Sequence, residues 1–321
     1  MKNFARCAFA AAWFFLLLVA TAFAQFPQGA ITVVLTAGPG DGSDIAMRLM
    51  AEDLRRTLKV PLVIVNKPGA GGVLATESVV RANKDGYTLL FSNNAPLTFR
   101  PVMDPDTTRY DALKELLPLG MVSRTPFLLA TRSDLAYRDL AAFIAAAKKS
   151  PGAMRIATVG TGSVGDFTVD AISALTGTAF TVVPYKGATP AVTALTAGQV
   201  EGTAITMSAL IAGLKSGTLR PLVISSKYPD YPDIPTLKEL GHAGNLIGVW
   251  TAFFAPSGIP AEARSVLIAA FKSAITDPAL RGKLLAAGLV ADYSPPEEVQ
   301  REMREELRMV REFARRAGLA K

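Results

Sequence analysis

The feature that most constrains this fold is a pattern of strands, glycine loops and helices that occurs twice along the chain. Each copy begins with an apolar run, at residues 31–35 and 155–159, that leads into a glycine-rich loop and a helix. The loops read TAGPGDGSD at 36–44 and GTGSVGD at 160–166. In both copies a second strand, a turn with Lys, a second helix and a third strand with a polar end follow. This repetition predicts an α/β fold with two domains of similar topology.

The two glycine loops also indicate where a ligand binds. Each loop joins the carboxyl end of a strand to the start of a helix, and ligands of parallel α/β sheets bind at that end. Backbone N–H groups in the first turn of a helix lack intrahelical partners and attract anions. We therefore expect the two loops to hold a ligand, with a preference for an anionic group.

Strands that cross between the two domains set the expected boundaries. Residues 119–123 and 127–131 are candidates for the outward crossing, and residues 248–256 for the return. We expect the second domain to span residues 124–249. The first domain would then comprise residues 25–123 together with about 250–321.

The last helix has a clear start signal. Ser294-Pro295-Pro296-Glu297 is a capping box with proline at the first helical position. Val299, Met303, Leu307 and Val310 then recur on one face, which predicts a buried stripe. We expect the glutamates and arginines of this helix to form a solvated, mutually paired face.

The N-terminus has the pattern of a secretory signal. Lys2 and Arg6 precede an apolar run at about residues 7–20, and Ala22-Phe23-Ala24 provides a small-residue cleavage site. We predict cleavage after Ala24, with an uncleaved membrane anchor as the alternative. Because Cys7 would leave with the signal, the mature chain would contain no cysteine, which excludes disulfides and thiol chemistry. These features favour a bacterial periplasmic location.

Composition excludes several other functions. His242 is the only histidine, so no histidine metal cluster can form, and we expect neither a metal nor a cofactor. The net charge of +7 becomes +5 once Lys2 and Arg6 are removed, and this excess is spread along the chain. The sequence therefore does not indicate nucleic-acid binding, and it supports only a mild preference for anionic ligands.

Two enzymatic interpretations fit the motifs poorly. The G-x-G-x-x-G at 160–165 resembles a dinucleotide motif, but Pro184, Tyr185 and Lys186 stand where an acidic ribose ligand is expected. Asp166, directly after the motif, would also repel a pyrophosphate. A hydrolase would need a G-x-S-x-G elbow, which is absent, and His242 as its only histidine base. We therefore predict that the protein is not an enzyme.

Several motifs in order resemble one family. They are LTAGPGDGSD at 35–44, VNKPGAGG at 65–72, DGYTLL at 85–90, VPYKG at 183–187, GQV at 198–200 and PDIPT at 232–236, followed by Trp250 and Ala255-Pro256. This series is similar to the substrate-binding receptors of tripartite tricarboxylate transporters, also called Bug proteins. The resemblance covers essentially the whole mature chain.

The resemblance implies a periplasmic binding protein of the two-domain, two-crossover type (periplasmic binding protein-like II). Its cleft would lie between the domains, close by hinge motion on a small carboxylate, and deliver it to membrane permease subunits. The protein would act as a monomer. Within this class, the alternative is a binding protein that serves a signalling sensor and no transporter. Outside this class, the alternative is an exported α/β hydrolase.

On this basis the ligand carboxylate would meet the first loop, and the second loop would close over it from the other domain. Amides at the end of one strand and a hydroxyl at the end of another would add contacts. The expected ligand-binding residues are Gly38, Pro39, Gly40, Asp41, Gly42, Ser43, Asp44, Asn93, Asn94, Gly160, Thr161, Gly162, Ser163, Val164, Asp166 and Thr206. Lys67 and Lys186 can instead brace their turns.

Departures from the family pattern leave the ligand open among di- and tricarboxylates, amino acids and aromatic acids. Val164-Gly165-Asp166 stands where members usually carry Ser-x-His, and Ile205 stands where many carry Asp. Asp41 replaces a common glycine of the first loop. Asp166 can hold a ligand amine, or it can complement the N-terminus of its own helix.

Overall fold

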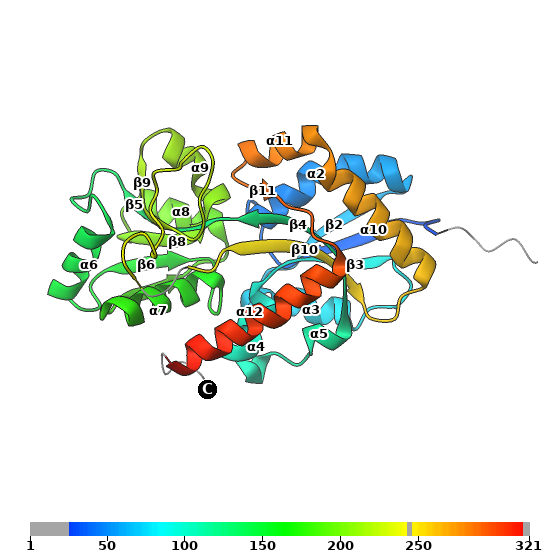
Figure 1. Cartoon of the computed structure of the whole chain (residues 1–321), viewed down its shortest axis with the longest axis horizontal. Coiled ribbons are helices and arrows are strands. Elements are labelled where there is room, and N and C mark those ends of the chain that lie inside the picture. The colour runs from blue at the N-terminus through cyan, green and yellow to red at the C-terminus, as the bar shows by residue number, and fades with distance from the viewer. Residues whose placement is uncertain (1–25, 243–245, 317–321) are drawn as a thin grey trace, which may run out of the picture.

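The structure is a computed structural model that describes residues 26–242 and 246–316, so the predicted secretory signal lies outside the described residues. Two β-sheets, each with helices on its faces, form the two halves of the molecule (Figure 1). The predicted α/β fold class with two similar sheets is confirmed. Within the described residues, no helix is both long and apolar enough to cross a membrane.

The first sheet has six strands in the order β11-β4-β10-β3-β1-β2. β1 is parallel to β2 and β3, while β10 is antiparallel to β3 and β4. The strands are β1 (Ile31–Leu35), β2 (Leu62–Asn66), β3 (Thr88–Asn93), β4 (Leu116–Thr125), β10 (Val249–Pro256) and β11 (Val290–Ala291). The helices of this half are α2 (Gly42–Leu58), α3 (Val73–Val80), α4 (Arg100–Met103), α5 (Ala112–Glu115), α10 (Ala261–Thr276) and α11 (Pro278–Ala286), with the short turns η1 (Ala70–Gly72), η2 (Ala95–Phe99) and η3 (Pro105–Thr107).

The second sheet has five strands in the order β7-β6-β8-β5-β9. β6 is parallel to β7 and β8, as the repeated pattern predicts, and β5 is antiparallel to both of its neighbours. The strands are β5 (Phe127–Arg132), β6 (Arg155–Thr158), β7 (Thr181–Pro184), β8 (Gly202–Thr206) and β9 (Leu219–Ile224). The helices are α6 (Leu140–Lys149), α7 (Val164–Thr176), α8 (Ala188–Thr196) and α9 (Met207–Lys215).

The two helices that border the second glycine loop and the Lys turn begin differently. α7 begins at Val164, because the side chain of Ser163 accepts a hydrogen bond from the N–H of Asp166. α8 begins at Ala188 after Gly187, which offers no capping side chain. Asp166 is therefore inside the first turn of α7.

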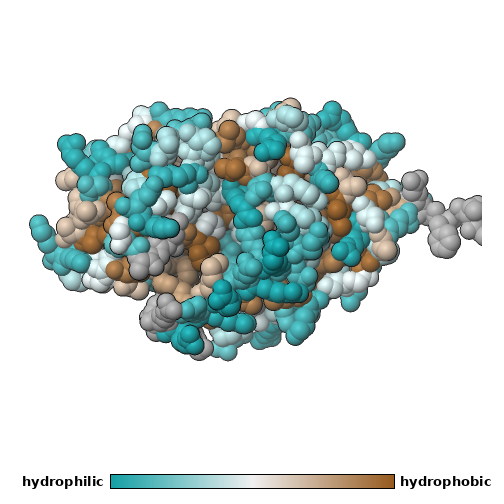
Figure 2. All heavy atoms as spheres, in the orientation of Figure 1, coloured by the Kyte–Doolittle hydropathy of each residue, from teal (hydrophilic) through white to brown (hydrophobic). Residues whose placement is uncertain are grey.

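The chain crosses between the halves twice, and the last helix spans both. Only Pro126 separates β4 from β5, and the return crossing leads from β9 into β10. α12 (Pro296–Arg316) packs Val299 and Met303 against the first half. Further along, Val310 and Ala314 join the core of the second half (Figure 1). Its outward face is mostly hydrophilic (Figure 2), as the sequence predicts.

Glu306 is an exception to the predicted solvated face of α12, because its side chain is buried where α12 packs against β10. Its Oε1 accepts hydrogen bonds from Asn94 Nδ2 at 2.8 Å and Thr98 Oγ1 at 2.7 Å. Its Oε2 accepts from Trp250 Nε1 at 2.6 Å. Burial raises the pKa of Glu306 to about 7 despite these three donors, and nearby Glu302 adds to the effect. Glu306 thus ties α12 to the start of β10.

The raised pKa of Glu306 predicts a pH-dependent stability. The unfolded chain releases this proton near pH 4.5 and the folded protein near pH 7, so the stabilisation is complete below 4.5 and is lost as pH rises through 7. Relative to a Glu306→Gln variant, the wild type should lose about 2 kcal/mol of unfolding free energy between pH 5 and 8. Urea denaturation across this pH range measures the free energy of unfolding of both proteins. A wild type and a variant whose free energies change in parallel with pH would contradict the prediction.

Candidate functional site

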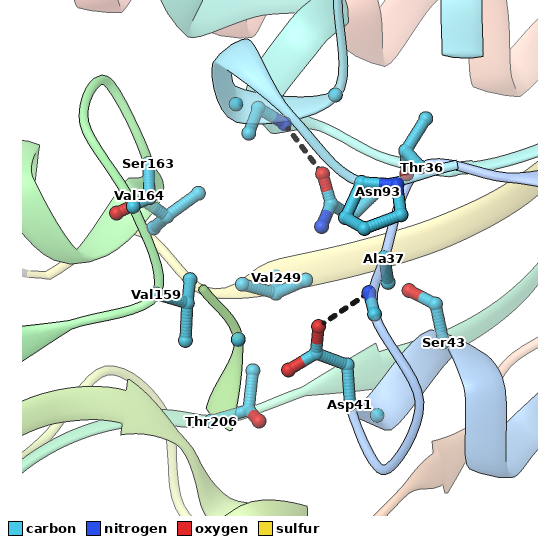
Figure 3. A pocket seen from close by; sticks show the side chains of 18 of the residues that line it. Thr36, Ala37, Asp41, Ser43, Asn93, Val159, Ser163, Val164, Thr206 and Val249 are labelled. Carbon is cyan, nitrogen blue, oxygen red and sulfur yellow. Dashed lines mark hydrogen bonds between the residues drawn. The ribbon is translucent and has the colours of Figure 1, made fainter. Parts of the chain in front are cut away.

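A cavity of about 640 Å³ lies between the two halves, at the carboxyl ends of β1, β3, β6 and β8. Both predicted glycine loops contribute to its wall, as do the turn η1 and the crossing strands (Figure 3). Of the predicted ligand-binding residues, those that line the cavity are Gly38, Asp41, Gly42, Ser43, Asn93, Gly160, Thr161, Ser163, Val164 and Thr206. Ten of the sixteen predicted residues thus lie at one cavity, and their contact with a ligand stays a prediction.

The remaining predicted residues do not line the cavity. They are Pro39, Gly40, Asp44, Asn94, Gly162 and Asp166. Asn94 points away from it, since its Nδ2 donates to the carbonyl oxygen of Gly248 at 3.0 Å and to Glu306. The polar end of β3 thus separates into Asn93, which faces the cavity, and Asn94, which anchors α12.

The first loop uses its own carboxylates to hold its backbone. The N–H of Gly38 donates to Asp41 Oδ2 at 2.9 Å, and the N–H of Gly40 donates to Asp44 Oδ2 at 3.0 Å. Burial alone would raise the pKa of Asp44, but hydrogen bonds from Arg48 and Asn66 outweigh it and lower the pKa. These two loop amides are therefore already partnered, which corrects the expectation that they face a ligand carboxylate.

The second loop is braced in the same way. Asp166 Oδ2 accepts from the N–H of Gly162 at 2.7 Å, and Oδ1 accepts from Thr158 Oγ1 at 2.6 Å. Burial raises the pKa of Asp166, and these hydrogen bonds offset part of the rise. Since both oxygens hold its own loop and strand, the structure accounts for Asp166 as a complement to its helix N-terminus rather than as a ligand for an amine.

Three donors of the first half remain available to the cavity. Asn93 Oδ1 accepts from the N–H of Ala95 at 3.0 Å, which fixes the amide so that Nδ2 points into the cavity (Figure 3). Thr36 Oγ1 is buried without a hydrogen-bond partner, and Ser43 Oγ lies in the first turn of α2. Donors from three elements converging on one corner of the cavity suit a carboxylate.

The opposite wall of the cavity includes an apolar patch. Val159 and Val164 lie on the second half, Val249 lies at the return crossing, and Phe127 begins β5 (Figure 3). Sequence reasoning missed Thr36, Phe127 and Val249. Thr36 could have been found, because it is the polar residue that directly follows β1, but Phe127 and Val249 have the sequence signature of buried strand residues.

The two halves contact each other on several sides of the cavity. Asp41 Oδ1 accepts from the N–H of Ala188 at 3.0 Å, and Arg100 Nη1 donates to the carbonyl oxygen of Thr161 at 3.4 Å. Tyr228 donates its hydroxyl hydrogen to the carbonyl oxygen of Leu285. The cavity therefore lies between halves that are in contact. No cluster of acidic, histidine or cysteine side chains suited to a metal occurs among the described residues.

Two lobes with crossing strands and a cavity between them, at the ends of both sheets, define a solute-binding protein of the two-domain periplasmic type. The family described as "Tripartite tricarboxylate transporter family receptor" matches residues 46–319. The chain therefore belongs to this receptor family. Membership is consistent with a role in binding and transport.

Individual relatives align with this chain over most of their length. The chain is 32% identical to Protein BugT of Bordetella pertussis over 278 residues, which is 86% of this chain and 85% of BugT. The structure of the periplasmic binding protein BugD aligns with a TM-score of 0.86 at 25% identity, covering 92% of this chain and all of BugD. The structure of R. palustris Rpa4515 with adipate aligns with a TM-score of 0.87 at 26% identity, covering 92% and 99%.

The unpartnered hydroxyl of Thr36 gives a test that separates binding from stability. Thr36→Val should leave the unfolding free energy of the free protein unchanged, or raise it by up to about 1 kcal/mol, because no hydrogen bond is lost. Affinity for a bound carboxylate should fall about 10-fold. Thr98→Val is the control, since Thr98 donates to Glu306 away from the cavity, and it should lower stability instead. Calorimetric titration and urea denaturation measure both effects, and unchanged affinity for Thr36→Val would contradict the assignment.

Proposed function

We propose that the protein is a periplasmic receptor that captures a small carboxylate between its two halves and delivers it to the membrane subunits of a tripartite tricarboxylate-type transporter. The observation that carries this proposal is the group of unpartnered donors, Asn93 Nδ2, Thr36 Oγ1 and Ser43 Oγ, at a cavity of about 640 Å³ between the two halves. The adipate bound by Rpa4515 supports a carboxylate ligand, and family membership supports the transporter partner.

In this proposal the carboxylate binds first to the half that carries the three donors. The second half then closes over the ligand, bringing Val159, Val164 and the loop at Thr161 against its body. The two crossings, at Pro126 and just before β10, act as the hinge. Lys186, an exposed cation of the cavity wall, attracts the anionic ligand before closure.

The proposal also includes export. Cleavage after Ala24 would release a chain in which Trp250 is the only tryptophan, because Trp13 lies in the signal. The Trp250 indole binds Glu306 beside the return crossing, so its fluorescence reports on this hinge. Closure on a ligand should change its emission, whereas a rigid cavity would leave it unchanged.

A thermal-shift screen tests the function. Protein that begins at Gln25 is melted with mono-, di- and tricarboxylates, amino acids, aromatic acids, neutral sugars and nucleotides. A ligand that binds only the folded state raises the melting temperature by mass action. At 100 times its Kd, such a ligand adds roughly 2.7 kcal/mol to the free energy of unfolding. The proposal predicts shifts with carboxylates. It fails if a sugar or a nucleotide shifts the melting temperature and no acid does.

A further inference from the structure

Asp41 links the two halves through its side chain. It precedes α2, but its carboxylate does not cap that helix. Oδ2 accepts from the N–H of Gly38, while Oδ1 accepts from the N–H of Ala188 at 3.0 Å, across 147 residues of sequence. Ala188 is the first residue of α8, whose own cap residue is a glycine without a side chain. Asp41, on the first half, therefore provides the hydrogen-bond acceptor that the cap residue of α8, on the second half, does not offer.

This carboxylate belongs to the cavity wall and carries charge there. Burial raises the pKa of Asp41 to about 6, hydrogen bonds from Ala188 and Gly38 limit the rise, and the like charge of Asp44 adds to it. At pH 7.5 the group is therefore mostly ionised. No ion pair joins Asp41 to a cation in the described part of the chain, and the other charged side chain of the cavity wall, Lys186, is exposed.

A ligand with two carboxylates would face a conflict in this cavity. Its first carboxylate can bind Asn93, Thr36 and Ser43, but the N-terminus of α8, where a second one would find a free N–H, is already occupied by Asp41. A second carboxylate beside Asp41 would face a like charge in the wall, and the cation that the wall offers, Lys186, is exposed and therefore screened by solvent. Phe127, Val159, Val164 and Val249 give the wall an apolar patch that suits the body of such an acid, and the polar side chains beside it are hydroxyls and the exposed Lys186.

We propose that Asp41 sets the ligand class of this receptor: by placing its own carboxylate at the N-terminus of α8, it restricts the cavity to acids that carry a single carboxylate on an apolar body. This inference rests on the proposed function and narrows it. Selection works by repulsion, since the same carboxylate that closes the two halves rejects a second negative charge.

Hexanoate and adipate test this inference, because they share a six-carbon chain and differ in the second carboxylate. Calorimetric titration at pH 7.5 should show hexanoate binding about 30-fold more tightly than adipate to the wild type. In Asp41→Asn, adipate should gain about 10-fold while hexanoate changes less than about 3-fold. Asp44→Asn is the matched control, since Asp44 lies in the same loop but outside the cavity wall, and it should leave the ratio of affinities unchanged.

The outcomes separate the inference from the proposed function. If adipate binds the wild type as tightly as hexanoate, or if Asp41→Asn leaves their ratio unchanged, the inference is overturned and the carboxylate receptor stands. An amino acid such as leucine that binds more tightly than hexanoate, and loses this advantage in Asp41→Asn, would also overturn it, because Asp41 would then attract a cation. If no acid binds, both fall. Melting temperatures of each variant confirm that the fold is retained.

Discussion

Replacement of Gly162 by alanine should lower the free energy of unfolding by about 4 kcal/mol. A Cβ at this position would lie 1.9 Å from Arg100 Nη1, and the backbone has a φ of +73°. Arg100 cannot move aside freely, because only 4% of it is exposed and its Nη2 donates to Asp104 Oδ2 and Thr107 Oγ1, both at 2.7 Å. The methyl group would displace a buried guanidinium that joins the second loop to the first half.

The chain offers a matched control for this effect. Gly217 has a nearly equal φ of +71°, but a Cβ there would meet nothing within 4 Å. Gly217→Ala should therefore cost only the backbone strain, about 1 kcal/mol. The double variant Gly162→Ala with Arg100→Ala should cost less than the sum of its single variants, because the clash disappears. Equal losses for the two glycine variants, measured by urea denaturation, would show that Arg100 does not fix this loop.

Replacement of Ser43 by aspartate should weaken binding of any carboxylate by roughly 1,000-fold. Ser43 lies in the first turn of α2 and faces the cavity beside the other donors (Figure 3). A carboxylate there would lie close to that of the ligand, and two such charges about 4 Å apart repel by about 4 kcal/mol at an effective dielectric of 20. The loss is expected in affinity rather than in fold, because acidic residues are favourable in the first turn of a helix.

Ser43→Asn is the control for size and shape, since asparagine fills the same volume without the charge. It should weaken binding by about 10-fold at most, through loss of the hydroxyl and crowding. Calorimetric titration with the acid that gives the largest thermal shift compares the two variants. If the aspartate and asparagine variants bind this acid equally, the carboxylate does not bind at the first turn of α2.

The location of the cleft was predictable because its determinants are local in sequence. A glycine loop between an apolar strand and a helix has few possible geometries, and the carboxyl ends of parallel strands lie on one edge of a sheet. Ser43, Asn93 and Thr206 follow from these rules alone. Thr36 could have been added on the same reasoning.

The role of each acidic side chain was not predictable in the same way. Asp41, Asp44 and Asp166 all lie in or beside glycine loops, and the sequence does not reveal whether such a carboxylate faces a ligand or binds its own backbone. The structure shows that Asp44 and Asp166 brace their loops, whereas Asp41 lines the cavity and caps a helix 147 residues away. Such contacts depend on how the halves meet, which no local pattern encodes.

The burial of Glu306, in contrast, has a local signal. At the 100° spacing of a helix it falls beside Val299, Met303 and Val310, on the buried stripe of α12. Its partners Asn94 and Trp250 are 212 and 56 residues away in sequence. The stripe therefore indicates that Glu306 is buried, but not which groups bind its carboxylate.

A comparison of acids with their own amides measures the central claim most directly. Hexanoate with hexanamide, and benzoate with benzamide, differ in charge but hardly in shape, so calorimetric titration of the protein from Gln25 isolates recognition of the carboxylate. If Asn93, Thr36 and Ser43 bind a carboxylate, the tighter-binding acid of these pairs should exceed its amide by about 100-fold in affinity. Amides that bind as tightly as their acids would contradict a carboxylate receptor.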